Sequence, residues 1–138
     1  MTGALVVIGT LVLASALGLA LRARNGRVRT TTPTGDLPED VRRALAPGGV
    51  TLVQLSTTFC APCRQARVLL ADLASRTAGL HHTELDLTER PDLARELSVL
   101  RTPTTLAFDG HGTEILRVGG VPKRDALLDA LRPHLATA

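Results

Sequence analysis

The sequence predicts an α/β fold with a mixed central sheet between layers of helices, preceded by one transmembrane helix. Three observations lead to this prediction. The chain begins with a long apolar run without charges, Gly3–Leu21. After it, short runs that favour strands alternate with segments of helical periodicity, which is typical of an α/β domain. Finally, Asp109-Gly110-His111-Gly112 has the composition of a hairpin turn, which adds an antiparallel strand.

The run Gly3–Leu21 is long enough to cross a bilayer, since as a helix it would extend roughly 28 Å. A cleaved signal peptide is the alternative. That would need a positively charged region before the apolar run, and only the amino terminus precedes this one. Residues 1–22 are therefore predicted to anchor a single-pass protein in the cell membrane.

Four arginines follow the anchor closely: Arg22, Arg24, Arg27 and Arg29. By the positive-inside rule they place the following domain in the cytoplasm, with an extracytoplasmic domain as the alternative. They also account for the net charge of +3, because the rest of the chain has 12 basic and 13 acidic residues. A nearly neutral domain with two Phe, no Trp and no Tyr has neither a basic face nor stacking platforms, so no nucleic-acid partner is expected.

Residues 23–35 are predicted to be a basic juxtamembrane linker, a tether that includes a short edge strand at Arg27–Thr31. Residues 36–138 are predicted to form one domain. Its first helix begins around Asp36–Asp40, where Pro38 and the acidic residues suit a first turn. Val50–Ser56 follows as a buried central strand.

The next helix is expected from about Cys60 to Arg76, with an apolar face at Val68, Leu69, Leu70 and Leu73. The remaining elements are a strand at His82–Leu87, a helix at Glu89–Leu97, strands at Thr104–Phe108 and Thr113–Val118, and a closing helix from Pro122 to about Ala136. Two crossovers through helices imply parallel strands, and the hairpin adds an antiparallel one.

The only two cysteines, Cys60 and Cys63, lie where a strand gives way to a helix, which is a redox signature. The helix N-terminus favours a negative sulfur, so Cys60 is predicted to be the nucleophile that attacks a substrate disulfide. Cys63, one turn later and more buried, is predicted to resolve the mixed disulfide. Pro62 stiffens the turn between them.

Three segments in order resemble one known family: Phe59-Cys60-Ala61-Pro62-Cys63, then Thr102-Pro103-Thr104, then Gly119-Gly120 with the helix after Lys123. The sequence resembles the thioredoxin family over roughly residues 37–136, and with its anchor it looks like the membrane-tethered thioredoxin-like proteins of bacteria. The resemblance implies a thioredoxin-like three-layer sandwich and a thiol–disulfide oxidoreductase. It also implies protein disulfide substrates, a thiol electron donor, no cofactor, no metal and a monomeric domain.

The resemblance further implies a cis peptide before Pro103, which would pack against the disulfide, and a backbone at Thr102 that binds substrate as an added strand. Together with Phe59, Ala61 and Pro62 these residues form the expected substrate site. A trans proline that opens an edge strand is the alternative for Pro103.

The sequence departs from the family pattern at three positions. Gln54 stands where the family has a buried Asp that assists proton transfer from the second cysteine, Glu84 stands where it often has a Lys, and Phe59 replaces a Trp. One hypothesis is that Glu84 relays the proton of Cys63, through Gln54. The alternative is a solvated Glu at the edge of the sheet.

Three other functions compete with this one. A zinc site would need about four ligands, and His81 and His82 could join the cysteines only if adjacent strand residues faced the same way. A purely structural disulfide closing so short a loop would restrain the unfolded chain little. A non-catalytic membrane adaptor with the same fold would not need both cysteines.

Overall fold

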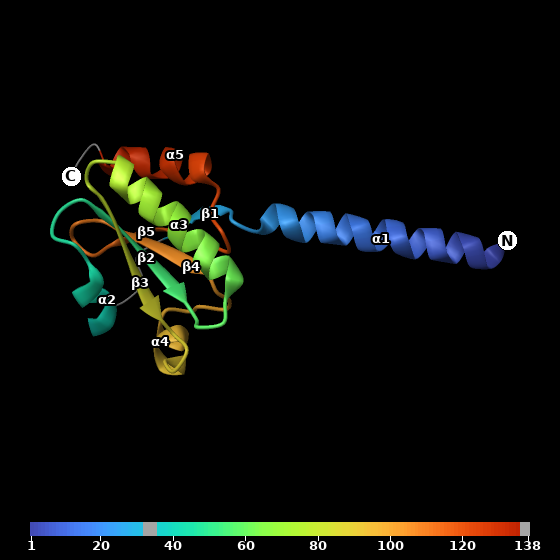
Figure 1. Cartoon of the computed structure of the whole chain (residues 1–138), viewed down its shortest axis with the longest axis horizontal. Helices are drawn as coiled ribbons and strands as arrows, with labels where there is room; N and C mark the ends of the chain where they lie inside the picture. The colour runs from blue at the N-terminus through green and yellow to red at the C-terminus, as the bar shows by residue number, and fades with distance from the viewer. Residues whose placement is uncertain (32–35, 136–138) are drawn as a thin grey trace.

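The computed structural model describes residues 1–31 and 36–135 as a sheet domain with one long helix projecting from it (Figure 1). The helices are α1 (Thr2–Arg24), α2 (Glu39–Ala44), α3 (Ala61–Arg76), α4 (Pro91–Glu96) and α5 (Arg124–Leu135). The strands are β1 (Val28–Thr30), β2 (Val50–Ser56), β3 (Leu80–Asp86), β4 (Thr104–Phe108) and β5 (Glu114–Gly119). They form one five-stranded sheet in the order β1-β5-β4-β2-β3. The expected mixed sheet is thus present.

Apolar side chains fill both faces of the sheet, because successive residues of a strand point to opposite sides. On β2, Leu52 belongs to the core under α3 and α5, whereas Val53 and Leu55 belong to the core under α2 and α4. All seven residues of β2 are buried. The result is the expected sandwich of helix, sheet and helix, and it makes β2 a rigid support for the segment that follows it.

The boundaries of the domain's elements agree with the sequence predictions to within three residues, and those of β2 and β4 coincide. The last residue expected in the closing helix, Ala136, lies outside the described residues. One predicted core position was wrong: Val68 is 71% exposed. The buried face of α3 instead consists of Cys63, Ala66, Leu70 and Leu73.

The prediction of two parallel crossovers was right for the first and wrong for the second. β3 runs parallel to β2, but β4 runs antiparallel to it. α4 has six residues and extends only about 9 Å, whereas a seven-residue strand such as β3 extends about 23 Å. The chain therefore re-enters the sheet at the end where it left: Ser56 pairs with Asp86, and its neighbour Leu55 pairs with Thr104.

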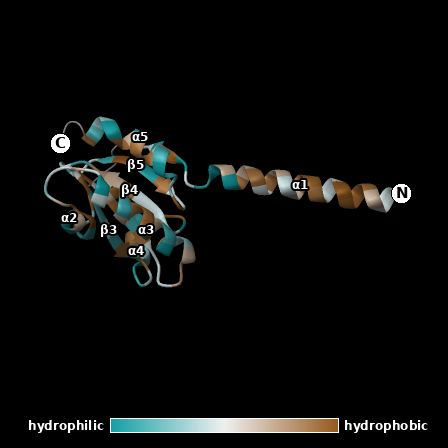
Figure 2. Ribbon diagram, turned by 45° about the horizontal axis from the view of Figure 1, so that its top comes forward, coloured by the Kyte–Doolittle hydropathy of each residue, from teal (hydrophilic) through white to brown (hydrophobic). Residues whose placement is uncertain are grey.

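Apolar residues follow α1 along almost its whole length (Figure 2). They are spread around the helix and not confined to one face, and none is buried. α1 is long and apolar enough to cross a membrane. A signal sequence near an N-terminus can have the same length and composition.

The segment after α1 is only partly the expected tether. β1 is the predicted edge strand, and it pairs with β5. This part of the linker therefore belongs to the sheet. The end of the predicted linker, residues 32–35, lies outside the described residues.

Candidate active site

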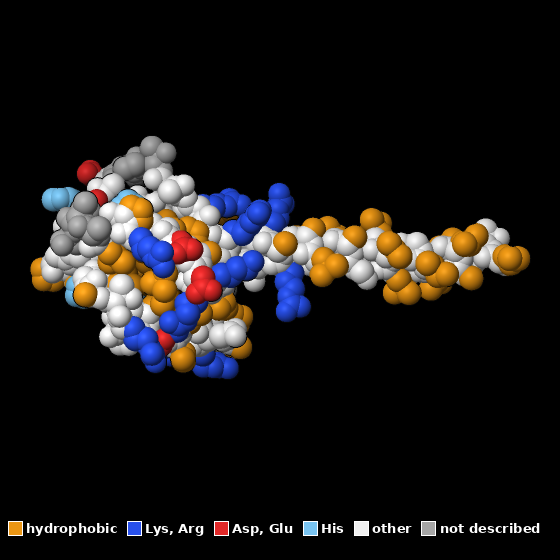
Figure 3. Space-filling model, turned by 90° about the horizontal axis from the view of Figure 1, so that it is seen from above, with side chains coloured by type: hydrophobic (Ala, Val, Ile, Leu, Met, Phe, Trp, Pro, Cys, Tyr) orange, Lys and Arg blue, Asp and Glu red, His pale blue; other side chains and the backbone are white. Residues whose placement is uncertain are grey.

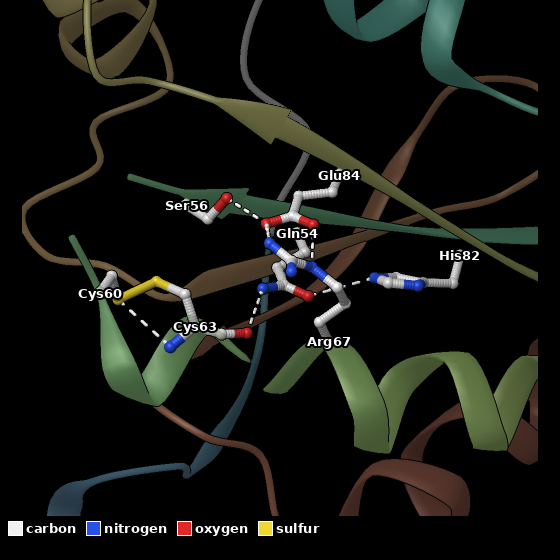
Figure 4. Close-up of polar contacts among 7 residues, drawn as sticks. All are labelled: Gln54, Ser56, Cys60, Cys63, Arg67, His82 and Glu84. Atoms are coloured by element: carbon white, nitrogen blue, oxygen red, sulfur yellow. Dashed lines mark hydrogen bonds and ion pairs between the residues drawn. A yellow bond between two sulfur atoms is a disulfide. The ribbon is translucent and has the colours of Figure 1, made fainter. Parts of the chain in front are cut away.

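Cys60 and Cys63 form a disulfide at the N-terminus of α3. Cys60 is the N-cap residue, and the backbone N–H of Cys63 donates to its sulfur at 3.2 Å (Figure 4). Cys60 is 8% exposed and Cys63 is 1% exposed. A helix N-terminus stabilises negative charge, so the sulfur of Cys60 is the one placed to become a thiolate, while Cys63 is shielded from solvent.

The other expected substrate-site residues lie at the same end of the sheet as this disulfide. The Thr102–Pro103 peptide is cis, as expected from the sequence. Its loop lies beside the end of β2, because the hydroxyls of Thr57 and Thr102 are 3.3 Å apart. Within the part of the chain that the structure describes, the backbone N–H and C=O of Thr102 have no hydrogen-bond partner.

The exposed rim of the site is formed by the residues next to the cysteines. Ala61 and Pro62 are exposed, and Phe59 is 98% exposed. Phe59 therefore does not cover the disulfide as a lid. It presents an apolar ring to whatever approaches.

Gln54 lies fully buried beneath α3 and connects two of its neighbours (Figure 4). Its Nε2 donates to the carbonyl oxygen of Cys63 at 2.8 Å, and its Oε1 is 3.2 Å from Nε2 of His82. Because an amide oxygen only accepts, Nε2 of His82 must be the donor. Burial lowers the pKa of His82, against the opposing effect of nearby Glu84. The neutral imidazole is thereby favoured.

Glu84 pairs with other partners than the hypothesis expects. Its carboxylate accepts from Arg67 at 2.5 and 2.8 Å and from the hydroxyl of Ser56. The hydrogen bond from Arg67 lowers the pKa of Glu84, so this carboxyl is ionised at neutral pH. Glu84 and Gln54 are neighbours on adjacent strands, yet no direct hydrogen bond joins these two described side chains.

Glu84 is also not a freely solvated edge residue. It is 22% exposed and lines a hollow with Ser56, Thr57, Thr58, Arg67 and Asp86. The hollow gives it access to water.

Sequence reasoning missed the contact of His82 with Gln54 and the ion pair of Arg67 with Glu84, although Arg67 itself is exposed. The strand begins at Leu80, two residues earlier than predicted. Since alternate residues share a face, a buried Leu80 puts His82 and Glu84 on the face beneath α3. The burial of Leu80 was the signal that could have revealed them.

The ligands required by the zinc alternative are committed elsewhere. The two cysteines bond to each other, and His82 bonds to Gln54. Residues 1–31 and 36–135 contain no group of three or more His, Cys, Asp or Glu side chains that could hold a metal ion.

Comparison with known proteins gives consistent matches. A family model described as Thioredoxin matches residues 38–133. The chain is 32% identical over 96 residues to "Thioredoxin-2" of Pyricularia oryzae. The aligned region covers 69% of this chain and 56% of that protein. It is 31% identical over 88 residues to "Thioredoxin" of Staphylococcus saprophyticus, covering 63% of this chain and 84% of that protein. A third relative, the "Bifunctional thioredoxin reductase/thioredoxin" of Mycobacterium leprae, is matched over only 17% of its length.

Solved structures show the same fold. An X-ray structure of Fasciola hepatica thioredoxin superposes with a TM-score of 0.54 at 23% identity, covering 63% of this chain and 82% of that one. A mutant thioredoxin from Halobacterium salinarum gives 0.62 at 23% identity, covering 78% and 96%. The matched family region begins after α1 and β1.

Proposed function

This chain belongs to the thioredoxin family, and we propose that it is a thiol–disulfide oxidoreductase tethered to a membrane. The observation that carries the activity is the disulfide between a slightly exposed Cys60 at a helix N-terminus and a buried Cys63. The family and this pair together support exchange of electrons with protein disulfides. A thiol donor returns the protein to its dithiol form.

In the proposed reaction the dithiol form reduces a substrate disulfide in two steps. The thiolate of Cys60 attacks one substrate sulfur, a mixed disulfide forms, and the other substrate sulfur leaves and takes up a proton. Cys63 then loses its proton and attacks the sulfur of Cys60. That breaks the mixed disulfide, releases the second substrate thiol and leaves the Cys60–Cys63 disulfide.

The neighbouring residues are proposed to hold the substrate. The free backbone groups of Thr102 can pair with an extended substrate segment as an added strand, which holds its disulfide over Cys60. Pro103, Phe59, Ala61 and Pro62 would line the contact.

The test is insulin reduction by residues 25–138, a fragment that keeps β1 and so retains the whole sheet. The wild-type fragment should turn over, Cys60→Ser should abolish turnover, and Cys63→Ser should accumulate a mixed disulfide with substrate. If the wild-type fragment neither turns over nor titrates as a reversible dithiol, the adaptor function is favoured instead.

The proton of Cys63 still needs an acceptor, and Glu84 remains the proposed relay. Gln54 cannot pass the proton on, because its amide does not titrate and shares no hydrogen bond with Glu84, so the proposed path runs through water from the hollow that Glu84 lines. If Glu84 relays this proton, Glu84→Gln should slow the resolving step at least tenfold and alter its pH profile. Arg67→Gln is the matched control, because it breaks the same ion pair and keeps the carboxylate. An unchanged rate and pH profile in Glu84→Gln would leave Glu84 as a structural partner of Arg67.

The membrane part of the proposal is that α1 is an uncleaved anchor and that the domain faces the cytoplasm. Its support is the apolar surface of α1 and the arginines that follow it. In intact cells, a membrane-impermeant thiol reagent should leave Cys60 unlabelled after reduction. Labelling would place the domain outside, and a shortened mature chain would identify α1 as a signal sequence.

A further inference from the structure

The anchor joins the domain at one particular end of the sheet. β1 runs antiparallel to β5, so its first residue, Val28, pairs with Val118 near the end of β5. Just before β1, the N–H of Gly26 donates to the carbonyl of Gly119 at 2.9 Å. α1 therefore meets the sheet at the end where β5 finishes.

The active site occupies that same end. Gly119 pairs with Thr104, the first residue of β4, and the N–H of Gly120 donates to the carbonyl of Pro103 at 2.7 Å. Two hydrogen bonds on adjacent glycines thus connect Gly26, just after the anchor, with the cis-proline loop. In Figure 1, α1 leaves the domain on the side where α3 begins.

The short connection between the anchor and the domain is tightly packed, which restricts how far the two can move apart. A side chain at Gly26 would collide with the carbonyl oxygen of Val121, and one at Gly120 would collide with the side chain of Asn25. Asn25 and Gly26 are therefore packed against the loop after β5. The four steps along the chain from Arg24 to Val28 extend at most about 14 Å, so the anchor cannot carry this end far from the membrane.

Positively charged side chains are also concentrated at this end of the domain (Figure 3). Two hollows are lined by arginines from the end of α1, from β1 and the residue before it, from the loop before β4 and from β5: Arg22, Arg24, Arg27, Arg29, Arg101 and Arg117. Arg101 immediately precedes the Thr102–Pro103 peptide. Positive side chains beside a membrane span are attracted to anionic lipid headgroups.

Two large apolar side chains on the loops of this end are almost fully exposed. Phe59 is 98% exposed beside Cys60, and Leu100 is 97% exposed in the loop before β4. Basic and apolar groups side by side suit the boundary between headgroups and acyl chains.

We infer that the active-site end of the domain faces the bilayer, and that its substrates are disulfides held at the membrane surface by membrane-anchored proteins. This inference rests on the proposed anchoring and activity. A disulfide close to the headgroups lies within reach of Cys60, whereas a disulfide held far above the bilayer lies on the wrong side of the domain.

Orientation can be measured by fluorescence, because the chain has no Trp. Leu100→Trp places a reporter at the proposed membrane face, and His111→Trp places one in the exposed hairpin turn at the opposite end of the sheet. The full chain is reconstituted in vesicles of zwitterionic and anionic lipid with a quencher on the headgroup. We expect at least twofold stronger quenching of Leu100→Trp than of His111→Trp. Equal or reversed quenching would overturn the inference.

The substrate class is tested with lipid-anchored peptides in the same vesicles, using dithiothreitol as electron source. One peptide carries its disulfide next to the bilayer, and the other carries it on a 30-residue polyproline spacer, roughly 90 Å away. The near disulfide should be reduced at least tenfold faster, after subtraction of dithiothreitol alone. Equal rates, or a faster distant disulfide, would contradict the proposed substrate class.

Failures of the underlying proposals give different results. If the full chain does not co-float with the vesicles in a density gradient, the proposed anchoring is wrong, and so is the inference that depends on it. If residues 25–138 do not reduce insulin, the activity fails, and the fluorescence comparison still decides the orientation.

Discussion

Among single residues, Gln54 most distinguishes this site. It is a buried amide where related proteins are expected to have an acid, and it holds the carbonyl of Cys63 and the ring of His82. An amide neither takes up nor releases a proton at neutral pH, so it positions the first turn of α3 without serving as a base. The acceptor for the Cys63 proton must therefore be water or a group beyond Gln54.

Thr105 of β4 is paired with Gln54 on the adjacent strand β2, and its burial leads to a prediction about stability. It is fully buried, and its hydroxyl alone among buried side-chain polar atoms has no partner within the described residues. Thr105→Val should therefore be neutral or stabilise residues 25–138 by about 1 kcal/mol, because it removes an unpaired buried hydroxyl at nearly constant shape. Urea unfolding followed by far-UV circular dichroism would measure this in a chain without Trp or Tyr.

Its neighbour Thr104 supplies the control. The Thr104 hydroxyl is also nearly buried, but it donates to the carbonyl of Arg101 at 2.7 Å. Thr104→Val should destabilise by about 1 kcal/mol, since it breaks this bond. If both variants lose stability equally, the Thr105 hydroxyl has a partner in solution.

Among helices and strands, α3 is the most important for the site. It begins at the cysteines and packs against the sheet. Its buried positions are spaced three, four and three residues apart, at 63, 66, 70 and 73. Arg67 binds Glu84 on β3, and Arg124 of α5 binds Asp72. The helix is thus held on its apolar face by the core and on its flanks by ion pairs.

The packing of α3 predicts opposite outcomes for two nearby apolar residues. Leu70 is fully buried, so Leu70→Ala should cost about 2–5 kcal/mol of unfolding free energy. Val68 is 71% exposed, so Val68→Ala should change it by less than about 0.5 kcal/mol. The same urea titration measures both. A large loss in Val68→Ala would mean that Val68 packs against other residues of the domain in solution.

For the molecule as a whole, two partly buried titratable groups, His82 and Glu84, predict how stability depends on pH. Burial lowers the pKa of His82 below its ordinary value of 6.5 in the folded protein. As the pH falls below 6.5, the unfolded chain therefore binds a proton before the folded chain does, and stability decreases. The lowered pKa of Glu84 acts in the same direction, but only from about its ordinary value of 4.5 downward. The interval from about pH 7.5 to about pH 5 thus isolates His82.

We expect residues 25–138 to be less stable at about pH 5 than at about pH 7.5, and His82→Gln to reduce this difference. Gln is neutral at both values and can still donate to Gln54. Urea midpoints at the two pH values check the prediction. Equal pH dependence in wild type and variant would show that His82 does not titrate differently in the two states.

The succession of helices and strands, the apolar first helix and the two redox cysteines follow from local pattern, so the sequence alone was enough to predict them. Alternation and helical periodicity report burial within one element, and a Cys-x-x-Cys at a helix start needs no distant partner. The same holds for Thr102–Pro103, whose cis state followed from its resemblance to a family motif.

Contacts between segments that are distant in the sequence could not be predicted from local sequence pattern. The antiparallel direction of β4 depends on how short α4 is, and the partners of Gln54 and Glu84 depend on the register of β2 against β3. The pairing of β1 with β5 brings Gly26 to Gly119 and so sets the end of α1 beside the candidate active site. These features arise from where strands pair in space, and spacing along one chain does not specify which edge of the sheet a short terminal strand will join.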